Sequence, residues 1–147
     1  MSDRGNLRAL VERVTSAPGY TSSVGTRVLD VEAGRVEMAL DRSAGVVQGQ
    51  GYFHGGVIAG LADHAAGAAV TTALGPGRFA MTVSLQVNYL APAEGEALIA
   101  RARATKVGGT IGFAHVDVVS VHDGQEILCA VAMAALRSVE FPRGLTP

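Results

Sequence analysis

A single carboxylate stands in the stretch FHGGVIAGLADHAAGAAV, which runs from Phe53 to Val70 and reads as a helix. None of the helical neighbours of Asp63 at three and four residues has a charged or hydrogen-bonding side chain. These neighbours are Ala59, Gly60, Ala66 and Gly67. An ionised carboxylate in apolar surroundings is costly unless it is paired or hydrogen-bonded. Asp63 is therefore expected either at an exposed edge of the helix or in a cavity where reactive chemistry takes place.

Glycine is frequent in the same predicted helix, although each interior glycine costs about 0.5–1 kcal/mol relative to alanine. Leu61 is the only large aliphatic residue between positions 59 and 69. A helix this thin allows another backbone to come close, which offsets the cost. We therefore expect Gly60 and Gly67 to be packing residues that let an antiparallel sheet wrap tightly around the helix.

The elements that position this helix are predicted to be mostly strands. A short amphipathic helix at about 5–16 is expected to cover the core, and Gly75-Pro76-Gly77 ends the long helix of about 55–74. Gly108-Gly109 and Asp123-Gly124 each separate two alternating runs, which is typical of tight hairpins. The predicted strands lie at about 22–31 and 35–41, within the segments 79–93 and 95–107, and at about 110–121 and 126–138.

The strand that follows the long helix shows the clearest alternation. One predicted face carries Val83, Leu85, Val87 and Tyr89, and the other carries Thr82, Ser84, Gln86 and Asn88.

The composition indicates one folded domain over residues 1–147, with 1–20 as N-terminal helix and linker and 139–147 as a tail. A formal net charge of −1 without a dense basic run gives no electrostatic footprint for nucleic acid or an acidic membrane. The single cysteine, Cys129, fits a reducing compartment. The first residues lack the apolar run of a signal peptide. We therefore expect a cytoplasmic protein.

The pattern Gln48-x5-His54-Gly55-Gly56-x6-Asp63, followed by a small-residue helix and VSLQVNYLAPA, resembles the hotdog-fold acyl-CoA thioesterases. The phenylacetate-pathway branch is most similar, with the 4-hydroxybenzoyl-CoA thioesterases as near relatives. The resemblance covers about residues 22–138. It implies an α+β hotdog fold, in which an antiparallel sheet wraps a long central helix. It also implies a homodimer with shared active sites that often assembles further into a tetramer.

Catalytic roles follow from the resemblance residue by residue. Asp63 matches the carboxylate that attacks the thioester carbonyl or activates a water; both routes stay open. Gly55 matches the glycine whose backbone N–H polarises that carbonyl. Gln48 matches an amide that positions substrate or water, and Thr82 matches a hydroxyl that holds the nucleophilic water. Two departures stand out: Gln48 is combined with Asp63 rather than with glutamate, and Gly67 replaces a catalytic Ser or Thr of one branch.

The resemblance also implies substrate-binding residues. His54 and Gly56 belong to the motif, and we expect His54 mainly to order the start of the helix. Relatives pass the pantetheine and phosphates of coenzyme A over a β-hairpin. The matching residues here are Lys106, Gly108, Gly109 and Thr110.

No cofactor is implied, because coenzyme A is part of the substrate, and the histidine spacing gives no metal site. Cys129 lies in an apolar strand and is expected to be a packing residue. The main expectation is hydrolysis of a small aryl- or medium-chain acyl-CoA. A non-catalytic acyl-CoA-binding hotdog protein and a hotdog enoyl-CoA hydratase or dehydratase are the alternatives.

Overall fold

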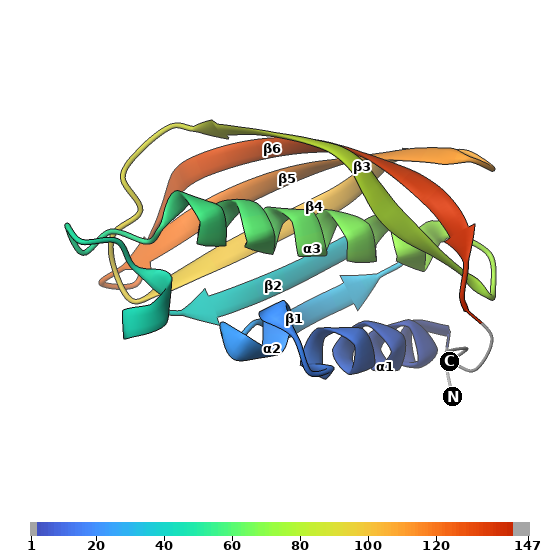
Figure 1. Ribbon diagram of the computed structural model, residues 1–147, viewed down its shortest axis with the longest axis horizontal. Coiled ribbons are helices and arrows are strands. Elements are labelled where there is room, and N and C mark those ends of the chain that lie inside the picture. The colour runs from blue at the N-terminus through green and yellow to red at the C-terminus, as the bar shows by residue number, and fades with distance from the viewer. Residues whose placement is uncertain (1–2, 143–147) are drawn as a thin grey trace.

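The computed structural model describes residues 3–142, which form one six-stranded antiparallel sheet curved around a long helix (Figure 1). The strand order is β1-β2-β4-β5-β6-β3. The elements are α1 (Asp3–Ser16), α2 (Tyr20–Ser23), β1 (Arg27–Glu32), β2 (Arg35–Asp41), a 3-10 turn (Ala44–Val46), α3 (Gly55–Ala73), β3 (Arg78–Tyr89), β4 (Ala97–Val107), β5 (Ile111–His122) and β6 (Gln125–Glu140). This is the α+β hotdog fold, and the expectation from the sequence is confirmed.

Two boundaries differ from the expectation. The first predicted strand began at residue 22, but Tyr20–Ser23 form the helical turn α2. Ser22 exchanges hydrogen bonds with the Gly19 backbone at 3.1 and 3.0 Å, and such local side-chain bonds compete with extended structure. The last strand reaches Glu140, so the predicted tail beginning at 139 starts later; residues 143–147 lie outside the described part.

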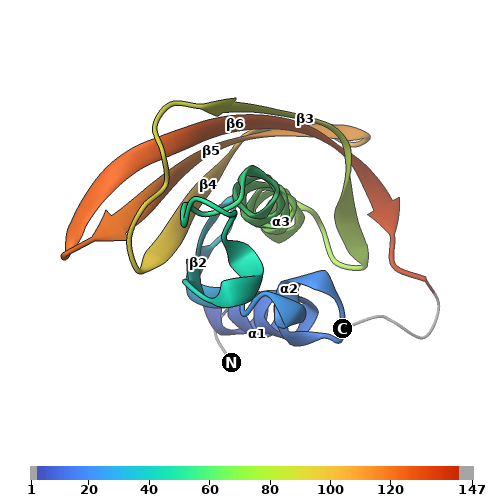
Figure 2. The ribbon, with the colours of Figure 1, turned by 60° about the vertical axis from the view of Figure 1, so that its left-hand side comes forward.

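The core lies between α3 and the concave face of the sheet, as Figure 2 shows. A glycine of the sheet makes room for α3, because a Cβ on Gly112 of β5 would lie 2.7 Å from the Val70 side chain of α3. The expectation that Gly60 admits the sheet is wrong. A Cβ on Gly60 would lie 2.5 Å from the Tyr20 hydroxyl, so this glycine makes room for α2. Gly67 is less constrained, with Leu136 at 3.9 Å.

The two edges of the sheet differ. The β1 edge is covered by α1, whose Arg4 Nε and Arg8 Nη1 each donate to a β1 carbonyl oxygen at 3.1 Å. The β3 edge pairs with no other strand within residues 3–142 and exposes Met81 and Val83. A long unpaired edge with apolar side chains is a surface that proteins usually cover.

No helix among residues 3–142 combines the length and the apolar character needed to cross a bilayer.

Candidate active site

Asp63 finds its partner on a strand rather than on its own helix. The side chain is half-buried on α3, and Thr82 Oγ1 of β3 donates a hydrogen bond of 2.7 Å to Asp63 Oδ1. Among the hydrogen bonds of residues 3–142, this is the only one that the carboxylate accepts, which leaves Oδ2 available. The hydrogen bond from Thr82 therefore fixes the Asp63 carboxylate and leaves its second oxygen open to a ligand or a water.

A β-bulge places Thr82 beside Asp63. Thr82 pairs with Leu136 and Ser84 with Ala135, so Val83 is an extra residue without a partner in the ladder. The bulge changes which face each side chain takes. Before the bulge Thr82 faces α3, and after the bulge Leu85 packs against the core. The uniform alternation expected for this strand is therefore wrong at Val83, which is 58% exposed.

A cavity of about 810 Å³ opens beside this pair, and we call it the acid cavity. It lies between α1, α3, the beginning of β3 and the residues after β6. Its lining includes Leu10, Val11, Arg13, Val14, Asp63, His64, Gly67, Ala68, Thr71, Phe79, Met81, Thr82 and Phe141.

The beginning of α3 presents an unpaired backbone donor. His54 is the N-cap residue, and its Nδ1 accepts the Gly56 N–H at 2.8 Å. The Gly55 N–H has no acceptor among residues 3–142, as expected for the first turn of a helix. A donor at this position also benefits from the helix dipole. Gly55 can therefore stabilise a negative oxygen, and His54 orders the helix start in agreement with the expectation.

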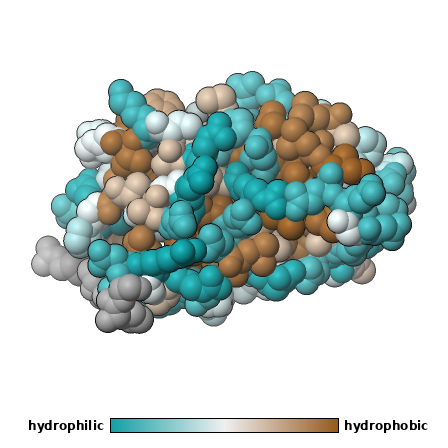
Figure 3. Space-filling view, turned by 180° about the vertical axis from the view of Figure 1, so that it is seen from behind, coloured by the Kyte–Doolittle hydropathy of each residue, from teal (hydrophilic) through white to brown (hydrophobic). Residues whose placement is uncertain are grey.

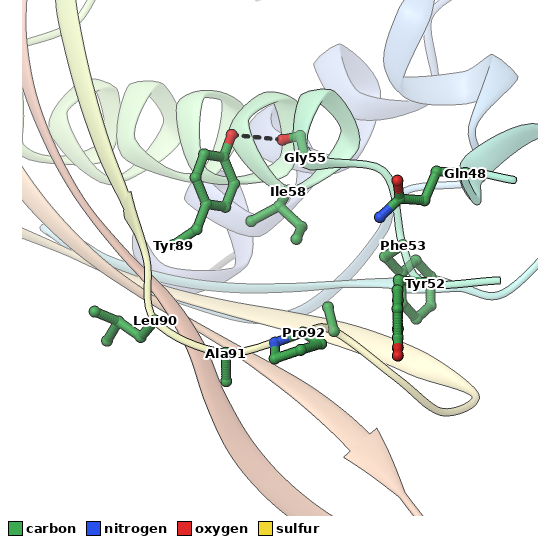
Figure 4. A pocket seen from close by; sticks show the side chains of 10 residues that line it. Gln48, Tyr52, Phe53, Gly55, Ile58, Tyr89, Leu90, Ala91 and Pro92 are labelled. Carbon is green, nitrogen blue, oxygen red and sulfur yellow. Dashed lines mark hydrogen bonds between the residues drawn. The ribbon is translucent and has the colours of Figure 1, made fainter. Parts of the chain in front are cut away.

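Gly55 lines a second cavity of about 460 Å³, which we call the glycine cavity. Figure 4 shows Tyr89 and Gln48 in this cavity with the start of α3 between them. The Tyr89 hydroxyl donates to the Gly55 carbonyl oxygen at 2.8 Å, and its ring would lie 3.4 Å from a Cβ at position 55. Sequence reasoning missed Tyr89, since an aromatic residue at the end of an edge strand carries no distinctive signal. Its hydroxyl fixes the Gly55–Gly56 peptide, which directly follows the candidate donor.

The candidate residues fall into two separate groups within one chain. Gln48 and Gly55 line the glycine cavity, whereas Asp63 and Thr82 line the acid cavity. Asp63 lies eight positions after Gly55 in α3, which corresponds to about 12 Å along the axis. One chain therefore does not bring the carboxylate and the backbone donor to the same point.

The predicted coenzyme A hairpin lies at a different place. Lys106 is exposed, and Gly108 N–H closes the turn by donating to the Ile111 carbonyl at 2.9 Å. The hairpin residues, which also include Gly109 and Thr110, line neither of the two cavities.

Two other side chains that could react, those of His64 and Cys129, make structural hydrogen bonds instead. His64 turns toward α1, where its Nε2 lies 2.9 Å from Thr15 Oγ1. Burial lowers the pKa of His64, and the neighbouring Asp63 carboxylate opposes this shift. The buried Cys129 thiol donates to the Val118 carbonyl at 3.3 Å, and burial raises its pKa, so it is a packing residue. Within residues 3–142, no three possible metal ligands cluster together.

Comparison with known proteins identifies the family. The model of the thioesterase superfamily matches residues 50–127, which is more than half of the chain. A protein of Halobacterium salinarum with a provisional esterase assignment is 35% identical over 127 residues, covering 82% of this chain and 83% of its own. A 1,4-dihydroxy-2-naphthoyl-CoA hydrolase of Listeria monocytogenes is 30% identical over 90 residues, covering 61% and 73%. The chain belongs to the thioesterase superfamily.

Solved structures agree with this assignment. A thioesterase family protein from Silicibacter pomeroyi superposes with a TM-score of 0.85 at 29% identity, covering 90% of this chain and 98% of that one. The E. coli PaaI protein from the phenylacetic acid degradation operon has a TM-score of 0.80 at 18% identity, covering 96% and 97%. At that identity the second likeness concerns the fold alone.

Proposed function

We propose that this protein is an acyl-CoA thioesterase that hydrolyses a small aryl- or medium-chain acyl-CoA to the free acid and coenzyme A. The observation that carries the proposal is the Asp63–Thr82 pair, a hydrogen-bonded carboxylate with one free oxygen on the wall of a large cavity. Membership of the thioesterase superfamily and the similarity to an acyl-CoA hydrolase support the same reaction.

The working form is proposed to be a homodimer in which each active site uses both chains. Two features support it. The carboxylate and the Gly55 N–H lie in different cavities of one chain, and the β3 edge has no partner among residues 3–142. Pairing two β3 edges around a twofold axis would bring the acid cavity of one subunit toward the glycine cavity of the other.

The chemistry assigned to the site is addition to the thioester carbonyl followed by loss of the thiolate. The Gly55 N–H donates to the carbonyl oxygen and stabilises the negative charge that develops there. Asp63 either removes a proton from the attacking water or attacks the carbonyl itself and forms an anhydride that water then opens. In both routes the C–S bond breaks and the coenzyme A sulfur receives a proton. Gln48 would position the substrate or the water.

Replacing the carboxylate tests this proposal. Asp63→Asn keeps the size of the side chain and removes its basicity, so kcat/KM for acyl-CoA hydrolysis should fall at least about a hundredfold. Release of the coenzyme A thiol measures the rate. Asp117→Asn is a matched control, because Asp117 is also half-buried and hydrogen-bonded, to His115 at 2.8 Å, but lines neither cavity.

Near-wild-type turnover in Asp63→Asn would remove Asp63 from the reaction. If the wild-type protein binds acyl-CoA and leaves the thioester intact after long incubation, it is a non-catalytic binder instead.

A further inference from the structure

We infer that the acid cavity is the acyl pocket and that α1 forms one of its walls. On this basis the protein selects uncharged apolar acyl groups of about six to twelve carbons, over short acyl groups and over chains that end in a carboxylate. This inference rests on the proposed function, because it assigns the acyl part of the substrate to the cavity that contains Asp63.

The size of the acid cavity fits an acyl group of this kind. Its volume of about 810 Å³ falls within the usual 300–1,000 Å³ of small-molecule sites. The glycine cavity, at about 460 Å³, is smaller and does not contain the carboxylate. An acetyl group would leave most of the acid cavity unfilled.

The walls of the acid cavity are mainly apolar and come from three sides. Val14 of α1 lies on one side, and the small residues Gly67 and Ala68 of α3 leave space on another. Phe79 at the start of β3 stacks on Phe141 after β6, with ring centroids 4.8 Å apart. In such a pocket each buried methylene improves binding by roughly fourfold. We therefore expect a steep dependence of the reaction on acyl length.

The α1 wall is held in place at both of its ends. At its C-terminal end, the buried Thr15 side chain contacts His64 of α3 at 2.9 Å. Thr21 Oγ1 reinforces this contact by donating to the Thr15 carbonyl oxygen at 2.8 Å. At the other end, Arg4 donates to β1. Figure 2 shows α1 below α3, and its hydrogen bonds to β1 hold it against the edge of the sheet. The residues that α1 contributes to the lining therefore form a fixed wall of the cavity.

The charges around the cavity disfavour an acyl chain with a terminal carboxylate. The Asp63 carboxylate already lies there, and burial lowers the pKa of His64, which disfavours a positive charge on the imidazole. Arg13 is the only basic residue other than His64 in the lining, and it is exposed to solvent. A second carboxylate would have to leave water for phenylalanine and valine side chains.

The test is a chain-length profile in variants that shorten the cavity. Ala68→Leu adds bulk from α3, and Ala73→Leu is its control, because Ala73 lies on the same helix but is exposed and outside the lining. Val14→Phe adds bulk from α1, and its control is Ala9→Phe on the exposed side of α1. Each protein is assayed for kcat/KM with straight-chain acyl-CoAs from acetyl to dodecanoyl and with adipoyl-CoA.

The wild type should prefer hexanoyl to dodecanoyl groups over acetyl, and hexanoyl over adipoyl, each by at least about tenfold. Ala68→Leu and Val14→Phe should lose at least about tenfold with decanoyl-CoA and less than about twofold with butanoyl-CoA, because the cavity is shortened. The controls should keep the wild-type profile. An unchanged profile in both cavity variants, or a preference for adipoyl-CoA, would overturn the inference while leaving hydrolysis at Asp63 intact.

Binding of non-hydrolysable thioethers separates this inference from the proposed function. Calorimetry should show that S-decyl-coenzyme A binds the wild type more tightly than S-ethyl-coenzyme A, and that Ala68→Leu weakens only the decyl ligand. Equal affinity of the two thioethers for the wild type would refute the acyl pocket even if hydrolysis occurs. Tighter binding of the decyl ligand without any hydrolysis would support the pocket and refute the enzyme.

Discussion

Gly55 and Tyr89 together define the donor half of the candidate site. The Gly55 N–H is unpaired within residues 3–142, while the Tyr89 hydroxyl and the His54 cap both fix the following Gly55–Gly56 peptide. The His54 carbonyl oxygen, which shares a peptide with the Gly55 N–H, accepts from the Val57 N–H at 3.0 Å. A donor held in this way needs no reorganisation when charge develops on the substrate oxygen. Stabilisation of the charge on the substrate oxygen is therefore expected to depend on a backbone N–H. Ordinary side-chain substitutions leave this group unchanged.

Gly55→Pro removes that N–H with little disturbance of the helix. Proline is favoured at the first helical position, and His54 already has the extended backbone, with φ −66° and ψ 137°, that precedes a proline. We expect kcat to fall by about 10²–10³, the usual effect of losing one such donor. Gly55→Ala is the matched control, because it adds a Cβ and keeps the N–H. Equal rates in the two variants, measured by thiol release, would exclude this backbone donor.

At the scale of elements, the α1–α3 contact joins the N-terminal helix to the helix that carries Asp63. The contact consists of the Thr15 hydroxyl and the His64 imidazole; Thr15 is buried and His64 is half-buried. Burial lowers the pKa of His64 in the folded protein below the ordinary value of 6.5. In acidic solution the imidazole therefore binds a proton more readily in the unfolded chain than in the folded one. His64 is therefore expected to make the folded state less stable as the solution becomes acidic.

Denaturation at several pH values checks this expectation. The free energy of unfolding of the wild type should decrease as pH falls below about 6.5, because the unfolded state then takes up a proton that the folded state excludes. His64→Gln lacks the titrating group, so its free energy of unfolding should decrease less between pH 7 and pH 5. The slope of this free energy against pH should differ from the wild-type slope by an amount that corresponds to at most about one proton. His122→Gln, at the exposed end of β5, is the control. Identical slopes in wild type and His64→Gln would show that the imidazole is not shielded.

The elements differ in how far the sequence could predict them. The ends of α3 follow from local chemistry, since His54 caps the start and Gly75-Pro76-Gly77 follows the end. The hairpin at Asp123-Gly124 has the positive φ values, 49° and 76°, that this dipeptide tolerates. The bulge at Val83 has no such signature, because an extra residue in a ladder depends on the partner strand. The contacts of Asp63 with Thr82 and of Gly55 with Tyr89 are likewise tertiary and could not be derived from periodicity.

At the scale of the whole molecule, the two edges and the outer face of the sheet suggest how copies could associate. α1 covers the β1 edge, whereas the outer edge of β3 pairs with no strand within residues 3–142. The face away from α3 is mixed: Figure 3 shows apolar patches crossed by polar bands in the view from behind. On this face Arg101 forms ion pairs with Glu37 and Glu126, while Phe113 and Met133 are exposed. A dimer through β3 is proposed, and the tetramer stays a prediction.

The measurement that tests the shared site most directly is complementation between two inactive variants. Asp63→Asn and Gly55→Pro chains, carrying different tags, are produced together so that mixed dimers form and can be purified. If each site takes its carboxylate from one chain and its backbone N–H from the other, a mixed dimer has one intact site and one doubly defective site. Its kcat should then reach about half of the wild-type value, far above either parent. Mixed dimers no more active than the two parents would contradict an active site built from both chains.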